Sequence, residues 1–235
     1  MKFRNPIMAA MLCVATMVGF TSCDDDNGGN DYPDNFAFKQ VLRVEQFNDG
    51  TTNALANFIA LDGKGQEVSV QLPKESSVFA NNTQMRYAPK EDGEINYYAY
   101  GAVIPGTPKE VRFVFRRLAN LDIVNTVNLE KVPMITPAMG GIENNKDYKF
   151  KLSVEGTDAR LRIFLMAMSG ENRGTQYDAV ITGTDNYRFS NVPAGTYSLR
   201  AMSTIITDHL QEQNGTAGGQ IEACKVYQIN SVTVK

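Results

Sequence analysis

The side chains best suited to covalent or metal chemistry in this 235-residue sequence are three cysteines and one histidine. Cys13 lies in an apolar run, Cys23 stands directly before three aspartates, and Cys224 lies in a second apolar run. His209 is the only histidine, and one histidine does not supply the closely spaced ligands of a zinc site. The sequence therefore predicts no metal and no cofactor, and the chemistry to explain is that of Cys23.

The residues before Cys23 predict an export signal. Lys2 and Arg4 make a short positive segment, and residues 7–20 are uncharged and mostly apolar. That run is shorter than the roughly 20 apolar residues that a membrane-spanning helix needs. It has the length and flanks of the hydrophobic part of a secretory signal. Cleavage before Cys23 removes Cys13, and one interpretation of the product is a soluble periplasmic protein with an ordinary thiol.

The residues around Cys23 support another interpretation, a lipid anchor. Phe20-Thr21-Ser22-Cys23 resembles the lipobox of bacterial lipoproteins, in which signal peptidase II cuts before the cysteine and the new N-terminus is acylated. The acidic run Asp24–Asp26 resembles the export signal that sends Bacteroidetes lipoproteins to the outer leaflet of the outer membrane. The resemblance implies fatty acids such as palmitate on Cys23 and a place on the cell surface. Each buried CH₂ contributes about 0.8 kcal/mol and stable anchoring needs more than one chain, a need that a triacylated cysteine meets.

The rest of the composition argues against nucleic acid as a partner and against a disulfide. The net charge is −3, and Arg112, Arg116 and Arg117 are isolated cations in a strand-like segment, so no nucleic-acid surface is predicted. Once the signal is removed and Cys23 is acylated, Cys224 has no cysteine partner. Stability must then come from packed cores, and we expect Cys224 to be a buried small hydrophobe.

Residues 23–35 predict an acidic, flexible tether that begins at the acylated cysteine. Asn27–Asn35 is rich in Gly, Asn, Asp and Pro, a composition typical of linkers. An alternative is a calcium site formed by four aspartates of this segment. The segment lacks the bidentate glutamate and the spacing of an EF-hand loop, so we favour the tether.

From Phe36 onward the sequence alternates apolar and polar residues, which is typical of half-buried strands. Apolar residues at 55–61 and 68–72 flank the turn residues Asp62–Gly65, which predicts a hairpin. Residues 53–58 hold at most one helical turn, and we find no sustained helical spacing elsewhere. Further alternating segments are 95–103, 111–116 and 123–129.

Two prolines and a Gly-Gly pair make residues 133–141 the best internal boundary. A second set of strand-like segments follows at 148–154, 161–167, 180–181, 187–189, 197–201 and 226–234. We therefore predict an all-β fold with two tandem β-sandwich domains of the immunoglobulin or prealbumin-like kind. They cover residues 36–135 and 136–235, after a signal peptide (1–22) and the tether (23–35).

One local motif, at residues 187–200, predicts the corner of a sandwich. It reads YRFSNVPAGTYSLR and resembles the signature of prealbumin-like domains, including carboxypeptidase regulatory-type and collagen-adhesin B-type repeats. Pro193 pre-sets the backbone for a turn and Gly195 is expected to supply a positive φ. The aromatic and aliphatic residues of the motif, Phe189, Tyr197 and Leu199, are expected to fill the core. The motif indicates a fold and not an activity.

Exposed aromatic residues are the remaining candidates for binding. Tyr98 and Tyr100 share one face of a strand-like segment, and tyrosine suits sugar or protein contacts because it combines an apolar ring with a polar tip. The alternative is that both pack against the linker or the second domain. The polar segment 207–220 is either a binding loop or disordered.

The predicted function is non-enzymatic. No nucleophile elbow, phosphate loop or dinucleotide fingerprint is present. Two prealbumin-like domains after a lipobox resemble the layout of fimbrillin-type pilus subunits of Bacteroidetes, which implies adhesion or surface assembly as a stalk, anchor or accessory subunit. The alternative is an accessory glycan-binding lipoprotein of a polysaccharide-uptake system. The partners implied are the outer membrane, through the lipid anchor, and other surface proteins or glycans.

Overall fold

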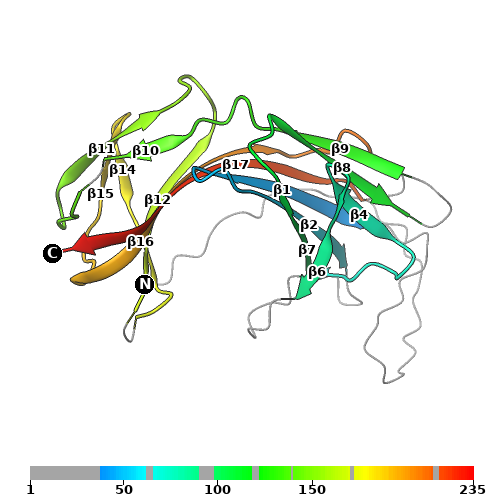
Figure 1. The fold of residues 1–235 in the computed structure, drawn as a ribbon, viewed down its shortest axis with the longest axis horizontal. Coiled ribbons are helices and arrows are strands. Elements are labelled where there is room, and N and C mark those ends of the chain that lie inside the picture. Colours follow the sequence, from blue (N-terminus) through cyan, green and yellow to red (C-terminus); the bar gives the residue numbers. More distant parts are fainter. Residues whose placement is uncertain are drawn as a thin grey trace.

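The computed structural model describes residues 38–61, 66–89, 98–117, 122–138, 140–169, 172–213 and 217–235, and these form an all-β protein. The predicted signal, Cys23 and the tether lie outside the described residues. The strands, β1 to β17, build three sheets, and the described ranges contain no helix, so no helix there crosses a membrane. Figure 1 shows the whole as an arch.

A nine-stranded sheet spans the arch from one end to the other, with β12 and β16 at one end and β7 and β6 at the other (Figure 1). Its strands in spatial order are β13 (Gln176–Asp178), β12 (Arg160–Ala167), β16 (Gly195–Thr207), β17 (Gly219–Val234), β1 (Lys39–Phe47), β2 (Thr52–Leu61), β7 (Tyr98–Ile104) and β6 (Arg86–Pro89). A short strand, β3 (Glu67–Ser69), also pairs with β2 and makes the hairpin predicted around residues 62–65.

Two four-stranded sheets cover one face of the large sheet, one toward each end. The first contains β5 (Thr83–Gln84), β4 (Ser77–Ala80), β8 (Glu110–Arg116) and β9 (Asp122–Asn128). The second contains β10 (Ile135–Pro137), β11 (Asp147–Leu152), β15 (Asn186–Arg188) and β14 (Val180–Thr182). Each small sheet and the part of the large sheet beneath it enclose a core, so the predicted all-β architecture with two sandwiches is confirmed.

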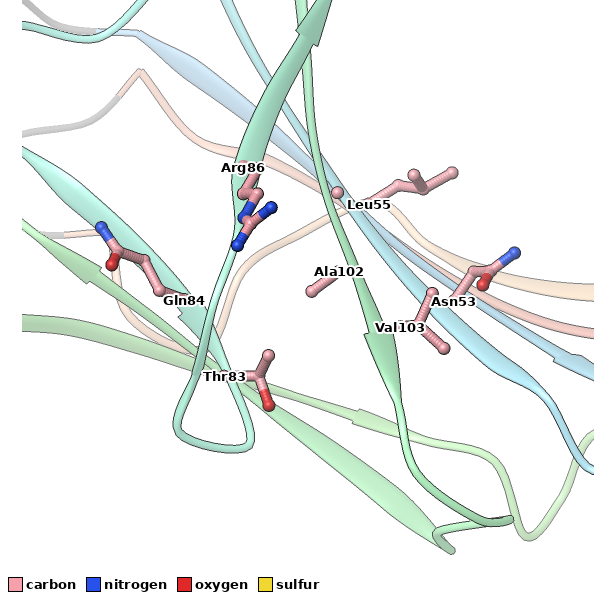
Figure 2. Close-up of a pocket in the computed structure, with 8 residues that line it drawn as sticks. Asn53, Leu55, Thr83, Gln84, Arg86, Ala102 and Val103 are labelled. Carbon is pink, nitrogen blue, oxygen red and sulfur yellow. The ribbon is translucent and has the colours of Figure 1, made fainter.

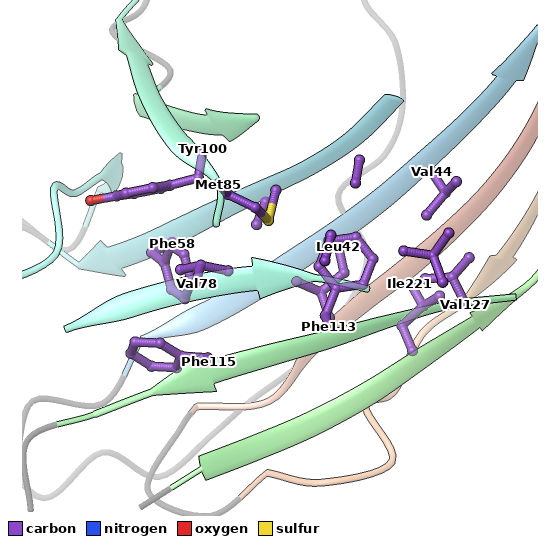
Figure 3. Close-up of a cluster of buried hydrophobic side chains, with 14 of the residues drawn as sticks. Leu42, Val44, Phe58, Val78, Met85, Tyr100, Phe113, Phe115, Val127 and Ile221 are labelled. Carbon is purple, nitrogen blue, oxygen red and sulfur yellow. The ribbon is translucent and has the colours of Figure 1, made fainter. Parts of the chain in front are cut away.

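The first core is rich in phenylalanine (Figure 3). Phe58 is fully buried, and its ring centroid lies 4.8 Å from that of Phe115 and 5.8 Å from that of Phe38. These residues come from β2, from β8 and from the residue before β1. Such aromatic pairs contribute about 0.5–1.5 kcal/mol beyond the area that they bury. The second core centres on Tyr187 and Phe189, whose centroids lie 5.8 Å apart.

The motif at 187–200 lies where it was expected, with one correction. Tyr197 is buried, and its hydroxyl donates a hydrogen bond to Pro193 O at 2.7 Å, as a turn between two packed strands requires. The positive φ belongs to Asn191 (59°) and not to Gly195. A Cβ at Gly195 would lie 3.3 Å from Cε2 of Tyr197, so any larger residue there would require the tyrosine ring to shift by a few tenths of an ångström.

The expected domain boundary between residues 135 and 136 lies close to the point where the chain first passes from one core to the other. It does not separate the cores in the rest of the chain. Val132 belongs to the first core and Ile135 to the second. Later residues return to the first core, namely Leu210, Ile221 and Ala223. The two sandwiches therefore share β16 and β17, and neither is a separate stretch of sequence. Residues 53–58, where one helical turn was allowed, lie in β2.

The first described strand pairs with the last one. β1 runs parallel to β17, in register from Gln40↔Gly219 to Phe47↔Val226, and antiparallel to β2 on its other side. Beyond Val226, β17 continues into the second core. The N-terminal end of β1, next to Gly219, therefore lies on the side of the molecule that is remote from the second core.

Candidate functional site

Tyr100 lies in the first core and is not an exposed ligand contact. Its exposed fraction is 9%, and its hydroxyl accepts a hydrogen bond from Leu72 N at 2.9 Å. Its ring stacks edge-on against Phe58 at 5.7 Å, and burial raises the pKa of its phenol. Tyr100 thus closes the core toward β3, which corrects the expectation of a binding tyrosine at this position. The side chain of Tyr98 lies outside what the structure describes.

Cys224 is buried, as the sequence predicted. It has no exposed surface, burial raises the pKa of its thiol to about 11, and its Sγ lies 3.4 Å from Oγ1 of Thr204. His209, in contrast, is exposed. Among the described residues no group of His, Cys, Asp and Glu side chains is arranged to hold a metal ion.

The polar segment 207–220 is tied to the protein over part of its length. Leu210 inserts into the first core, and Gln211 and Glu212 hydrogen-bond along the outer edge of β9. The alternative of a disordered segment is thus wrong for residues 208–213, which cover a strand edge. Residues 214–216 lie outside the described ranges.

One face of the large sheet carries neither of the small sheets, and we call it the open face. Along each strand, residues on this face alternate with residues that point into the cores, as Asn53 and Leu55 on β2 alternate with the buried Ala54 and Ala56. The open face also carries Arg43, Glu45, Val103, Arg200, Glu222 and Gln228.

A charge cluster lies at the middle of the open face. Arg43 donates hydrogen bonds to Glu45 Oε1 and to Glu222 Oε2, each at 2.8 Å. The three side chains are between 16% and 29% exposed. Gln220 Nε2 also donates to Glu222 Oε1 at 2.6 Å. Because its groups are mutually paired, this cluster is a structural feature of the face and not a free binding group.

An apolar hollow of about 530 Å³ lies at the edge of the large sheet around β7, and Figure 2 shows residues that line it. It is lined by Asn53, Leu55, Thr83, Gln84, Arg86, Gly101, Ala102 and Val103. Asn53, Leu55 and Val103 line it from the open face, whereas Ala102 packs against the first core and Thr83 and Gln84 form β5 of the first small sheet. Val103 is 65% exposed although it belongs to a sheet. Gly101 forms part of the floor, and a Cβ there would meet only Leu55 Cδ2 at 3.5 Å and Ala54 O at 4.0 Å.

A second, polar hollow of about 320 Å³ lies toward the second core. It is lined by Phe47, Asn48, Asp49, Thr51, Asn53, Arg200, Gln228 and Asn230. Asn53 lines both hollows, so they meet on β2. Within the part of the chain that the structure describes, two buried polar atoms of this face have no hydrogen-bond partner, Nε of Arg200 and Oδ1 of Asn57.

Sequence reasoning missed this site because its residues come from strands far apart in the chain. The available signal was the alternation at 53–57, where Asn53 and Asn57 stand on one face and two alanines on the other. That pattern predicts a strand with a polar outer face, but it does not indicate that Arg200 lies opposite.

No protein-family model matches the chain, and no curated protein matches it either. Among solved structures, the chain is similar to the Ig1–Ig3 ectodomain of mouse nectin-like molecule 4, at 10% identity and a TM-score of 0.24, over 85% of this chain and 64% of that one. It is also similar to SGBP-B of the Bacteroides ovatus mixed-linkage glucan utilization locus, solved with a mixed-linkage heptasaccharide. That likeness has 12% identity and a TM-score of 0.20, over 76% of this chain and 53% of that one. The chain thus spans less than two thirds of either structure, and both likenesses are distant.

Proposed function

We propose that the chain is a non-enzymatic lipoprotein of the outer-membrane surface that acts in adhesion or surface assembly, as a stalk, anchor or accessory subunit. The observation that carries this proposal is the continuity of β16 and β17 through both cores. Because hydrogen-bonded strands run from one core into the other, β16 and β17 join the cores without a flexible linker. We therefore expect the two cores to move as one body.

The position of β1 orients the molecule relative to a lipid on Cys23. The first described residue, Phe38, lies at the end of β1 that is next to Gly219 and away from the second core. A flexible segment of the length of residues 24–37 has an end-to-end distance of roughly 20 Å. The first core then stands near the membrane, and the second core reaches outward.

A catalytic role finds little support in the described residues. The lone histidine is exposed, Cys224 is buried with a raised pKa, and neither borders a hollow of the open face. A nucleophile needs an adjacent base or a lowered pKa to react. We therefore retain the non-enzymatic role as part of the proposal.

Lipidation and exposure are tested together in cells that make the full chain. Labelled palmitate is expected to enter the wild type and Cys224→Ala but not Cys23→Ala. Protease added to intact cells is expected to degrade the wild type. If palmitate does not label the wild type, or if the protease leaves it intact, surface anchoring is refuted.

The role in adhesion needs its own measurement. Cells that lack the chain are expected to adhere or to aggregate less than the wild type, and the full chain is expected to restore the loss. If the deletion leaves both properties unchanged, adhesion and assembly are wrong. The alternative, an accessory role in glycan uptake, is favoured by one observation, the polar hollow around Arg200.

A further inference from the structure

We propose that the polar hollow and the open-face side of the apolar hollow form one groove that binds an oligosaccharide bearing carboxylate groups, with Arg200 as the anion contact. This inference deepens the glycan-binding alternative and names the ligand class. Its test uses soluble protein, so its failure is distinct from a failure of lipidation or of adhesion.

The state of Arg200 is the first support. Its Nε is buried and has no hydrogen-bond partner among the described residues, and an unpaired buried donor on a charged group is costly. Asp49 lines the same hollow, but its Oδ1 accepts a hydrogen bond from Thr51 N at 2.8 Å, and no ion pair joins it to Arg200. Every other lining residue of the polar hollow is uncharged. A guanidinium in this state is suited to a carboxylate, which accepts two parallel hydrogen bonds from it.

The amides around Arg200 are the second support. Gln228 Nε2 donates to Asn230 Oδ1 at 2.7 Å. This bond holds both side chains in place and leaves Oε1 of Gln228 as an acceptor and Nδ2 of Asn230 as a donor. A sugar hydroxyl both donates and accepts, so neighbouring hydroxyls fit such a pair. Asn53 supplies a further amide where the two hollows meet.

The apolar surfaces of the groove are the third support. Phe47 presents a half-buried ring to the polar hollow, and Leu55 and Val103 line the apolar one from the open face. The C–H faces of pyranose rings bury apolar area against such surfaces. Arg86 places a second cation beside the apolar hollow. Since the two hollows meet at Asn53, the groove suits a chain of several sugars rather than a single one.

Binding is tested with the mature chain, residues 23–235, carrying Cys23→Ser so that it stays in solution. The probes for calorimetry are hexasaccharides of galacturonate, of mannuronate and of alternating glucuronate and N-acetylglucosamine. We expect at least one to bind, and to bind less tightly as salt rises because part of the attraction is between charges. The methyl ester of the galacturonate hexamer removes the charge and keeps the sugar, and the esterified form of a binding hexamer is expected to bind at least about tenfold more weakly.

Single substitutions test whether the ligand binds in the groove. Arg200→Met is expected to weaken binding about tenfold or more, whereas Arg112→Met, which removes an exposed arginine from the first small sheet, is expected to leave affinity unchanged. Gly101→Leu fills the apolar hollow without backbone strain and is expected to weaken binding as well. Arg200→Met is expected to keep or raise the melting temperature, since an unpaired charge leaves the face.

Three results would overturn the proposal. They are the failure of all three hexasaccharides to bind at millimolar concentration, equal binding of the esterified hexamer, and full affinity in Arg200→Met. Binding of acidic peptides with the same dependence on Arg200, in the absence of sugar binding, would assign the groove to a protein partner and would also refute it.

Discussion

Asn125 and Gln211 each use a side-chain amide to bind the main chain of the other's segment. Oδ1 of Asn125 accepts hydrogen bonds from Gln211 N at 2.8 Å and Glu212 N at 3.1 Å. Oε1 of Gln211 accepts from Thr126 N at 2.5 Å, and its Nε2 donates to Thr126 O at 2.8 Å. The amide of Gln211 thus imitates the peptide group of a neighbouring strand. It occupies the edge of β9, which would otherwise be free to pair with another chain.

Removal of the buried member of this pair is expected to destabilise the protein. Asn125 is 1% exposed, and Asn125→Ala leaves two backbone N–H groups without an acceptor. We expect the free energy of unfolding in urea to fall by about 1–3 kcal/mol. Gln211→Ala, which changes an exposed side chain, is expected to cost less but to speed hydrogen exchange at the Thr126 amide.

Gln84→Ala is the control for these two variants, because Gln84 is an exposed glutamine on β5 at the opposite edge of the same small sheet. Gln84→Ala is expected to leave the rate of hydrogen exchange at the Thr126 amide unchanged. If Gln211→Ala leaves exchange at Thr126 as slow as in the wild type, the segment does not protect the edge of β9.

The charge cluster on the open face is expected to matter more than the exposed ion pairs. Arg43→Met leaves Glu45 and Glu222 half-buried near each other without a cation. We expect a loss of about 1–3 kcal/mol in urea unfolding, below the 3–5 kcal/mol of fully buried pairs because water reaches the site. Arg162→Met, which breaks the exposed pair with Asp178, is the control, with an expected loss of about 0–1 kcal/mol.

A second change separates the loss of pairing from the loss of packing. Adding Glu222→Gln to Arg43→Met removes one of the two unpaired carboxylates and is expected to restore part of the stability. If the double variant loses as much free energy of unfolding as Arg43→Met alone, or more, Arg43 acts through its aliphatic stem and not through its charge.

The shared strands predict that both cores unfold in one transition. Phe58→Ala in the first core and Phe189→Ala in the second are each expected to cost about 3–5 kcal/mol. Because β16 and β17 belong to both cores, each variant is expected to shift the urea midpoint of both. Hydrogen exchange at Leu42 and at Phe150 reports the two cores separately. A midpoint that moves in one core alone would show that the cores are independent.

The thiol of Cys224 is expected to resist modification in the folded protein. Burial raises its pKa from about 9 to about 11, so at pH 8 it is neutral and inaccessible. In the Cys23→Ser variant, iodoacetamide at pH 8 is expected to label Cys224 only after unfolding. Rapid labelling of the folded protein would contradict the burial of this side chain.

The same shift makes stability depend on pH in the alkaline range. Between pH 9 and 11 the thiol of the unfolded chain ionises while that of the folded chain stays neutral. The free energy of unfolding is therefore expected to fall as the pH rises through this window. Tyrosines with raised pKa values also lower the free energy of unfolding in this pH range. Cys224→Ala is therefore the control, and its free energy of unfolding is expected to fall less than that of the wild type.

Local patterns in the sequence were sufficient for several features of the fold. Alternation predicted most strands, glycine and aspartate predicted the hairpin between β2 and β3, and the prolines near 133 predicted the passage from one core to the other. The core positions of Phe189, Tyr197 and Leu199 follow from the same alternation. These features depend on neighbours in the chain, which a sequence displays directly.

Features that depend on distant neighbours were missed or misassigned. The polar segment after Thr207 gave no sign that Leu210 would reach the first core, because its contacts come from other strands. Tyr100 has the same period-two spacing as an exposed tyrosine, and only the position of Leu72 puts its hydroxyl inside. Whether an alternating face is buried is decided by the sheet that packs against it.

The sequence by itself determined most of the segments that form strands and which residues of each strand share a face, because the pleat imposes a period of two whatever the partner. It also contains the cysteine motif from which we infer a lipid anchor. Only the tertiary structure decided that β1 lies parallel to β17, that two cores share one sheet, and that Arg200 stands unpaired near Asn53. Strand pairing is made of main-chain hydrogen bonds that every residue except proline can form, so the choice of partner depends on how whole faces pack.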